Sequence, residues 1–195
     1  MTKTEVPDGR RVRGHENRRK IIEAMLAIIS EGTITPSAEE VATRANVGLR
    51  TVFRHFDDMD SLYRELSEVM NGELMPIAAA PMPEGGWRKK LAELALRRSR
   101  VFERMMPFKI AADVHRHRSK FLLDEHAQLN VIQRKILCDA LAPAIHLEGA
   151  TLEAMDLLMS FDVWRRLRQD QKLSVTEARD TVLLAAHQLL ESKYG

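Results

Sequence analysis

Two short helical segments, separated by a turn of only four residues, constrain the fold of this chain more than any other feature of its sequence. Ser37-Ala-Glu-Glu40 is a capping-box pattern, in which the serine oxygen and the glutamate side chain satisfy free backbone amides at a helix start. We expect that helix to run from Ala38 to about Arg44, and a second one from Leu49 to about His55. Between them, Asn46 is of a residue type that tolerates the left-handed backbone of so tight a turn.

Apolar residues at helical spacing also dominate the rest of the chain. They predict a helix over residues 17–30, stopped by Gly32, and a helix over 60–71, for which Asp57, Asp58 and Asp60 supply capping carboxylates. Residues 76–86 hold three prolines and two glycines and are expected to be irregular. Further helices are expected over residues 87–105, 108–118, 121–142, 150–169 and 175–193, the last one with a second capping box, Ser174–Glu177. With 9 glycines, 7 prolines and 5% aromatic residues, we expect an all-α fold.

Positive charge is concentrated near the N-terminus. Residues 9–20 hold six Arg or Lys residues against the single acid Glu16, whereas the net charge of the whole chain is only +2. A flexible basic arm that leads into a helix is suited to follow a phosphate backbone or to enter a minor groove. The alternative is a solvated tail that only improves solubility.

Several classes of protein are disfavoured by what the sequence lacks. The single cysteine, Cys138, cannot form an intramolecular disulfide or a paired metal or redox motif. Neither a signal peptide nor an apolar run of about 18 residues is present, so we expect a cytoplasmic protein without a membrane span. Glycine-rich phosphate loops and the nucleophile motif of hydrolases are also missing, which disfavours an enzyme. We therefore expect no cofactor.

A group of histidines and aspartates invites comparison with a metal site, namely His115, His117, His126, Asp113 and Asp124. Residues two apart on a helix point to different faces, and no histidine follows a Glu or Asp by three positions. We expect no metal here, although single histidines are suited to line a pocket.

The run from Ser37 to Leu62 resembles the signature of the TetR (tetracycline repressor) family of bacterial transcriptional regulators. That signature has an Ile/Val-Ala pair, then Ala-Gly-Val, then an aromatic residue, two further residues and Phe, and finally an acidic helix start and Leu. This chain matches it with Val41-Ala42, Ala45-Asn-Val47 and Phe53-Arg-His-Phe56. The motif resemblance covers about residues 15–66, and beyond it extends only to length and helix order.

Three positions depart from the family pattern. Asn46 stands where the family usually has glycine, which is conservative for backbone conformation. Phe53 replaces the usual tyrosine and cannot donate a hydrogen bond to a phosphate, and Met59 replaces a frequent lysine. Arg54, His55 and the basic arm are expected to compensate for the lost contacts.

The resemblance implies three parts: a flexible basic arm over residues 1–14, a helix-turn-helix DNA-binding domain over 15–60, and a ligand-binding and dimerisation domain over 61–195. The implied function is a homodimeric, sequence-specific regulator, a repressor that a small-molecule effector releases from its double-stranded DNA operator. One alternative is an all-helical small-molecule-binding protein or enzyme in which the helix-turn-helix is only structural. Another is a DNA-binding protein with no effector.

Base contacts are expected from the second helix of the motif. Arg50 is suited to bidentate contact with guanine, with a solvated surface role as the alternative, and Leu49 is suited to contact a thymine methyl group. Thr51 and His55 are suited to phosphates. The residues expected to contact DNA are Arg10, Arg11, Arg13, Ser37, Leu49, Arg50, Thr51, Phe53, Arg54 and His55. For Phe53, a place in the core is equally consistent with the sequence.

Two further sets of residues are expected in the C-terminal domain. The effector pocket is expected at Met106, Ile110, Val114, Phe121, Leu122 and Trp164, with His126 as a polar anchor. The predicted helix over 150–169 is apolar on more than one face, which indicates a two-fold four-helix bundle. The expected dimer interface comprises Leu152, Met155, Met159, Val163, Val182, Ala186 and Leu189.

Overall fold

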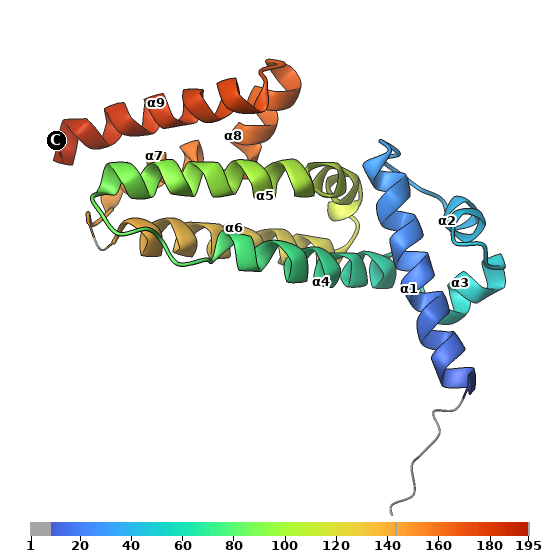
Figure 1. The fold of residues 1–195 in the computed structure, drawn as a ribbon. Coiled ribbons are helices and arrows are strands. Elements are labelled where there is room, and N and C mark those ends of the chain that lie inside the picture. Colours follow the sequence, from blue (N-terminus) through green and yellow to red (C-terminus); the bar gives the residue numbers. More distant parts are fainter. Residues whose placement is uncertain (1–8, 143, 195) are drawn as a thin grey trace, which may run out of the picture. The chain divides into compact units, whose positions relative to one another are not determined.

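The computed structural model describes residues 9–142 and 144–194, with side chains from Val12 onward. Within this part every regular element is helical, so the predicted all-α fold is confirmed (Figure 1). The elements are α1 (Gly9–Ser30), α2 (Ala38–Arg44), α3 (Leu49–His55), α4 (Met59–Ala78), α5 (Trp87–Arg116), α6 (Lys120–Leu141), α7 (Gly149–Leu158), α8 (Phe161–Arg165), the π-helical turn η1 (Arg166–Asp170) and α9 (Val175–Tyr194).

The chain divides into two compact units. The head unit comprises the described residues up to Met70 together with Pro107–Leu123, and the body unit comprises Asn71–Met106 and the described residues from Asp124 on. All three boundaries fall within helices, so α4, α5 and α6 each continue from one unit into the other. The expected boundary at residue 60 separates a DNA-binding domain from a ligand-binding domain. It does not coincide with the limits of the two compact units, and it stays a prediction.

In the head unit, the capping box and the turn residues have the conformations that the sequence predicts. The backbone N–H of Ser37 donates to Glu40 Oε2 at 2.7 Å and that of Glu40 donates to Ser37 Oγ at 3.2 Å, which completes the capping box of α2. Asn46 has a φ of 53° in the turn before α3, and Gly32 has a φ of 103° after α1. The α1–α4 core of this unit includes the fully buried residues Ile21, Met25, Val41, Leu62, Tyr63 and Leu66.

Four predicted helix boundaries are wrong. α1 begins at Gly9, so residues 9–14 are helical rather than part of a flexible arm. α4 continues through Pro76, and α5 continues through Pro107, where a break was expected. A proline removes one backbone N–H from a helix and crowds the preceding turn, but tertiary packing of the flanking turns outweighs that cost here.

The fourth correction concerns the predicted helix over 150–169, which the structure divides into α7 and α8. Ser160 accepts a hydrogen bond from the backbone N–H of Val163 at 3.2 Å and thereby caps α8. The signal was present in the sequence, but the continuous apolar pattern on either side concealed it.

The body unit is built on α5, α6 and the C-terminal helices. Its fully buried side chains include Leu91, Leu94, Leu137, Leu141, Met155 and Leu190. On α9, a buried stripe recurs every fourth residue at Ala178, Val182, Ala186 and Leu190, and α9 packs along α7 (Figure 1). Small residues in that stripe allow the close approach of the two helices.

The turn before α3 supports a first test. Asn46→Val should lower the free energy of unfolding by about 1–2 kcal/mol, because a β-branched side chain is strained at a positive φ. Asn46→Gly is the matched control and should stay within about 0.5 kcal/mol of the parent protein. Urea unfolding followed by circular dichroism measures both, and equal losses in the two variants would contradict the left-handed turn.

Candidate nucleic-acid interface and effector cavity

The α3 helix presents one face to solvent and one to the core of the head unit. Val52 and the following Phe56 are buried, whereas Leu49 is exposed and Phe53 has 54% of its surface accessible. Arg50 and Arg54 are exposed and form no hydrogen bond or ion pair with other described residues. The outward face of α3 therefore combines apolar groups with two cations whose N–H donors face water. Phe53 lies on this face and not in the core.

An arginine from α1 fixes the C-terminal end of α3; we call this arrangement the Arg18 clasp. Arg18 donates from Nε to Glu65 Oε1 at 2.6 Å and from a terminal nitrogen to the carbonyl oxygen of His55 at 2.8 Å. Its guanidinium carbon also lies 4.7 Å from the centre of the Phe56 ring. A cation at the last carbonyls of a helix complements the helix dipole. The clasp thus joins α1, α3 and α4, and the sequence analysis missed it.

Among the side chains expected to contact DNA, that of Ser37 has a structural partner and that of His55 is partly buried. Ser37 uses its hydroxyl in the capping box, where it also donates to Glu40 Oε2 at 2.9 Å. His55 is half-buried, and its Nε2 atom is buried without a hydrogen-bond partner among the described residues. Burial, assisted by the charges of Arg54 and Arg18, lowers the pKa of His55. A neutral, inward-facing imidazole is poorly suited to contact phosphate, contrary to the expectation.

Four further residues were expected to contact DNA, namely Thr51, Arg13, Arg10 and Arg11. Thr51 is half-buried in the first turn of α3. Arg13 is exposed on α1, so it projects from a helix. The side chains of Arg10 and Arg11 lie outside the described part of the chain, as do residues 1–8.

The segment between α5 and α6 contacts the start of α4 within the head unit; we call this the α4 latch. The hydroxyl of Ser119 donates to Asp60 Oδ2 at 2.8 Å and accepts from the backbone N–H of Leu122 at 3.1 Å. One turn further along α4, the Arg64 guanidinium lies 4.1 Å from the centre of the Phe121 ring. The latch ties the first residues of α6 to α4, and no sequence pattern predicted it.

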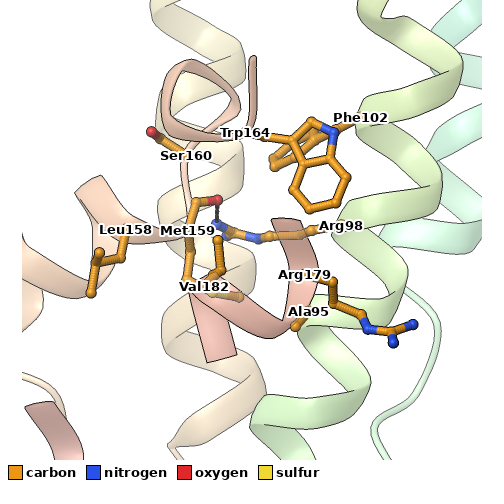
Figure 2. A pocket seen from close by; sticks show the side chains of 9 residues that line it. All are labelled: Ala95, Arg98, Phe102, Leu158, Met159, Ser160, Trp164, Arg179 and Val182. Carbon is orange, nitrogen blue, oxygen red and sulfur yellow. Dashed lines mark hydrogen bonds between the residues drawn. The ribbon is translucent and has the colours of Figure 1, made fainter. Parts of the chain in front are cut away.

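The body unit contains an inner cavity and an outer groove. The inner cavity lies between α5 and the α7–α8 junction, where Arg98, Phe102, Trp164 and Val182 line it (Figure 2). Trp164 is held there because its Nε1–H donates to Glu103 Oε1 at 2.8 Å. The outer groove has a volume of about 330 Å³ and runs between the end of α4, the start of α5 and α6. Pockets for small ligands begin at about this size.

The expected pocket residues are distributed over both units. Trp164 lines the inner cavity, and Met106 and His126 also belong to the body unit. The other four expected residues, Ile110, Val114, Phe121 and Leu122, belong to the head unit, where Val114 is exposed and Leu122 is buried. Phe121 takes part in the α4 latch instead. A single pocket formed by the whole set stays a prediction.

The expected dimer residues are largely covered by their own chain. Met155, Met159, Val182 and Ala186 are buried within the body unit, and Leu152, Val163 and Leu189 are half-buried. The apolar side chains that α7 and α9 expose are different ones, with Leu157 at 64% and Leu184 at 61% of their surface accessible. The apolar periodicity therefore marked the core-facing stripes of these helices.

The described residues also bear on whether the chain has a metal site or a membrane-spanning helix. Within them, no group of three His, Cys, Asp or Glu side chains is arranged to hold a metal ion. No helix in this part of the chain is both long enough and apolar enough to cross a membrane.

Comparison with known proteins identifies the fold. No protein-family model matches the sequence, and no curated protein does. A solved transcriptional regulator from Rhodococcus sp. RHA1 matches with a TM-score of 0.70 at 17% identity, over 90% of this chain and 96% of its own. A TetR transcriptional regulator from the same source matches with a TM-score of 0.59 at 18% identity, over 96% and 100%. The chain has the fold of TetR-family regulators.

A further solved neighbour is the multidrug binding protein EbrR complexed with imidazole. It matches with a TM-score of 0.56 at 19% identity, over 96% of this chain and 95% of its own. The agreement confirms the expected helix-turn-helix head, formed by α2 and α3, and the helical body. At these identities the likeness shows the fold alone and does not show what this chain binds.

The inward-facing His55 leads to a pH-dependent prediction. Because its pKa is lower in the folded protein than the ordinary value of 6.5, the unfolded chain binds the proton more readily below that pH. Stability is then unaffected by this group above about pH 6.5 and falls as the pH drops below it.

Replacing His55 by glutamine should therefore reduce the loss of stability between pH 7.5 and 5.5, measured by urea unfolding. His146→Gln serves as the control, because that side chain is exposed. An unchanged pH slope in His55→Gln would refute the buried, neutral state of His55.

Proposed function

We propose that the protein is a cytoplasmic, homodimeric regulator of transcription that binds a specific double-stranded DNA operator and releases it when a small molecule binds the body unit. The observation that carries the proposal is the outward face of α3, where Arg50 and Arg54 are exposed without ion-pair partners among the described residues. The fold shared with solved transcriptional regulators supports it, as does the multidrug-binding neighbour.

The chemistry of the α3 face matches the major groove of DNA. A guanidinium at the start of a recognition helix donates two hydrogen bonds to guanine, which suits Arg50. Leu49 is suited to contact a thymine methyl group, and Arg54 and Arg13 to contact phosphates. Because α3 is held at its C-terminal end by the Arg18 clasp, its exposed N-terminal residues have a defined direction.

A purely structural role for α2 and α3 explains this surface less well. Such a role requires Val41, Val52 and Phe56, which are buried, but not exposed apolar groups beside unpaired cations. An all-helical enzyme likewise has no use for that face. We therefore prefer a DNA-binding function and do not assign an enzymatic one.

The α4 latch provides a physical route for regulation. α5 and α6 continue from the body unit into the head unit, and the segment between them is hydrogen-bonded to Asp60 on α4. Glu65, five residues further along α4, belongs to the Arg18 clasp that holds α3. A small molecule that binds the DNA-incompetent arrangement more tightly would shift α3 through these contacts, and operator DNA must weaken that molecule equally.

Two copies are needed to contact successive major grooves, with recognition helices about 34–36 Å apart. We place the dimer face on the exposed sides of α7 and α9, around Leu157 and Leu184. This assignment replaces Met155, Met159, Val182 and Ala186, because those side chains are already covered by their own chain.

DNA contact by Arg50 is tested with operator DNA selected from a random library. Arg50→Ala should weaken binding by about 1–3 kcal/mol and relax the preference at one base position, since a bidentate base contact is lost. Arg54→Ala should weaken all sequences similarly and reduce the dependence of affinity on salt. Both effects are measured by titration at several salt concentrations.

Arg166→Ala is the matched control, because the Arg166 side chain is exposed and makes no hydrogen bond or ion pair with other described residues, yet lies in the body unit. It should leave affinity and base preference unchanged. Arg50→Ala with the base preference of the parent protein would refute base contact by this residue.

The dimer face is tested separately. Leu157→Glu and Leu184→Glu should each shift the protein towards monomers and weaken operator binding, because a carboxylate buried in an apolar interface costs several kcal/mol. Val131→Glu on α6 is the control, since Val131 has 68% of its surface accessible. Sedimentation velocity at micromolar concentration measures the assembly, and dimers in both leucine variants would place the interface elsewhere.

A further inference from the structure

An arginine is buried in the body unit without an acidic partner. Arg98 on α5 has only 7% of its surface accessible. One terminal nitrogen donates to the carbonyl oxygen of Met159, and the other donates to that of Gln133 at 2.6 Å. No carboxylate of the described residues lies within ion-pair distance of Arg98. The acid whose charge acts on it is Asp156, but that carboxylate accepts a hydrogen bond from Arg134 at 3.1 Å.

The buried charge of Arg98 is costly. Moving a guanidinium out of water costs several kcal/mol unless a counter-charge and hydrogen bonds replace the hydration. Burial lowers the pKa of Arg98 to about 10, so the group remains protonated at neutral pH. Two backbone carbonyls compensate only in part, because Nε–H and one N–H on each terminal nitrogen have no acceptor among the described residues.

The neighbouring Arg97 shows the contrast. It is also buried, but it donates to Glu93 at 2.6 Å and to the backbone carbonyls of Ala80 and Pro81, which follow α4. Its charge is therefore neutralised within the chain. Arg98, one residue further along the helix, points instead into the apolar space between α5 and the α7–α8 junction (Figure 2).

Arg98 is connected to the outer groove through a shared wall. A second small apolar cavity is lined by Arg98 and Phe102, which also line the inner cavity, and by Ala78 and Ile136, which also line the outer groove. The three spaces therefore share wall residues, and the outer groove, at about 330 Å³, is the largest of them. The groove is also lined by Lys90, whose Nζ donates to the carbonyl oxygen of Pro83 at 3.0 Å, and by Asp139, whose carboxylate pairs with Lys135 at 2.6 Å.

We propose that the effector is an amphipathic carboxylic acid, whose carboxylate binds Arg98 and whose apolar chain occupies the adjoining cavity and groove. This inference rests on the proposed function and specifies the chemical class of the molecule that regulates it. A carboxylate supplies the missing counter-charge and accepts the free N–H groups of the guanidinium, which presents them in a fork that matches a carboxylate. A neutral molecule of the same shape fills the same apolar space but leaves the cation uncompensated.

Binding at Arg98 has a defined structural consequence. The carboxylate binds the same guanidinium that holds the carbonyl oxygens of Met159, between α7 and α8, and of Gln133 on α6, and draws it away from them. Loosening the second contact changes the restraint on α6, whose first residue follows Ser119 of the α4 latch. The acid therefore acts on α6, one of the two helices that flank the latch segment.

The experiment compares octanoate with 1-octanol, which have the same apolar chain and differ in charge. Trp87→Phe protein is used as the parent, because Trp164 is then the only tryptophan and lies beside Arg98. Octanoate should change its fluorescence and bind about tenfold or more tightly than octanol, as expected for charge-assisted hydrogen bonds. Octanoate that binds no more tightly than octanol would overturn the proposal, as would binding seen by calorimetry without any change at Trp164.

Variants of Arg98 separate a ligand contact from a purely structural one. Arg98→Met should abolish the preference for octanoate over octanol, and Arg98→Lys should reduce it, because an ammonium lacks the bidentate fork. If Arg98→Met does not fold, Arg98→Lys carries the test, and an undiminished preference in that variant would refute the proposal. Arg166→Met removes an exposed arginine and should leave the preference unchanged.

These titrations contain no DNA, so their failure leaves the proposed DNA-binding function intact. A second titration with operator DNA tests regulation itself. Octanoate that binds at Arg98 without weakening the operator complex would contradict release by this acid while preserving the anion site.

Discussion

A helix of seven residues is not stable on its own in water, and α3 is such a helix. Its existence depends on anchoring from outside, through buried Val52 and Phe56 on one side and the Arg18 clasp at its end. The clasp is made of an ion pair to Glu65 on α4 and a hydrogen bond to the last carbonyl of α3. The direction of the candidate DNA-binding face is therefore set by residues on two other helices.

Local signals explain why much of the head unit was predictable. The capping box at Ser37 and the left-handed Asn46 act over three or four residues, so the sequence alone predicted both ends of α2 and α3. The Arg18 clasp and the α4 latch join residues 47 and 59 positions apart. Nothing in a single sequence indicates which arginine meets which carboxylate over such separations, and neither contact was predicted.

In the body unit the apolar pattern predicted the helices, but it did not show which of their apolar faces the chain covers itself. Met155 and Val182 belong to stripes that the chain covers itself, whereas Leu157 and Leu184 interrupt polar surfaces and carry no periodic signal. The sequence does not indicate that Arg98 is buried, since burial of a cation depends on what packs around it. Adjacent Arg97 and Arg98 have the same side chain but different partners, one a carboxylate and the other two carbonyls.

The three helices shared by the two units differ in mechanical stiffness. α5 contains Pro107, which leaves the carbonyl of Glu103 without its helical donor, and α4 contains Gly72 and Pro76. Each proline removes one helical hydrogen bond, so bending costs least near Pro76 in α4 and near Pro107 in α5. α6 contains neither glycine nor proline along its 22 residues. No residue along α6 therefore removes a backbone donor from the helix, unlike Pro76 in α4 and Pro107 in α5.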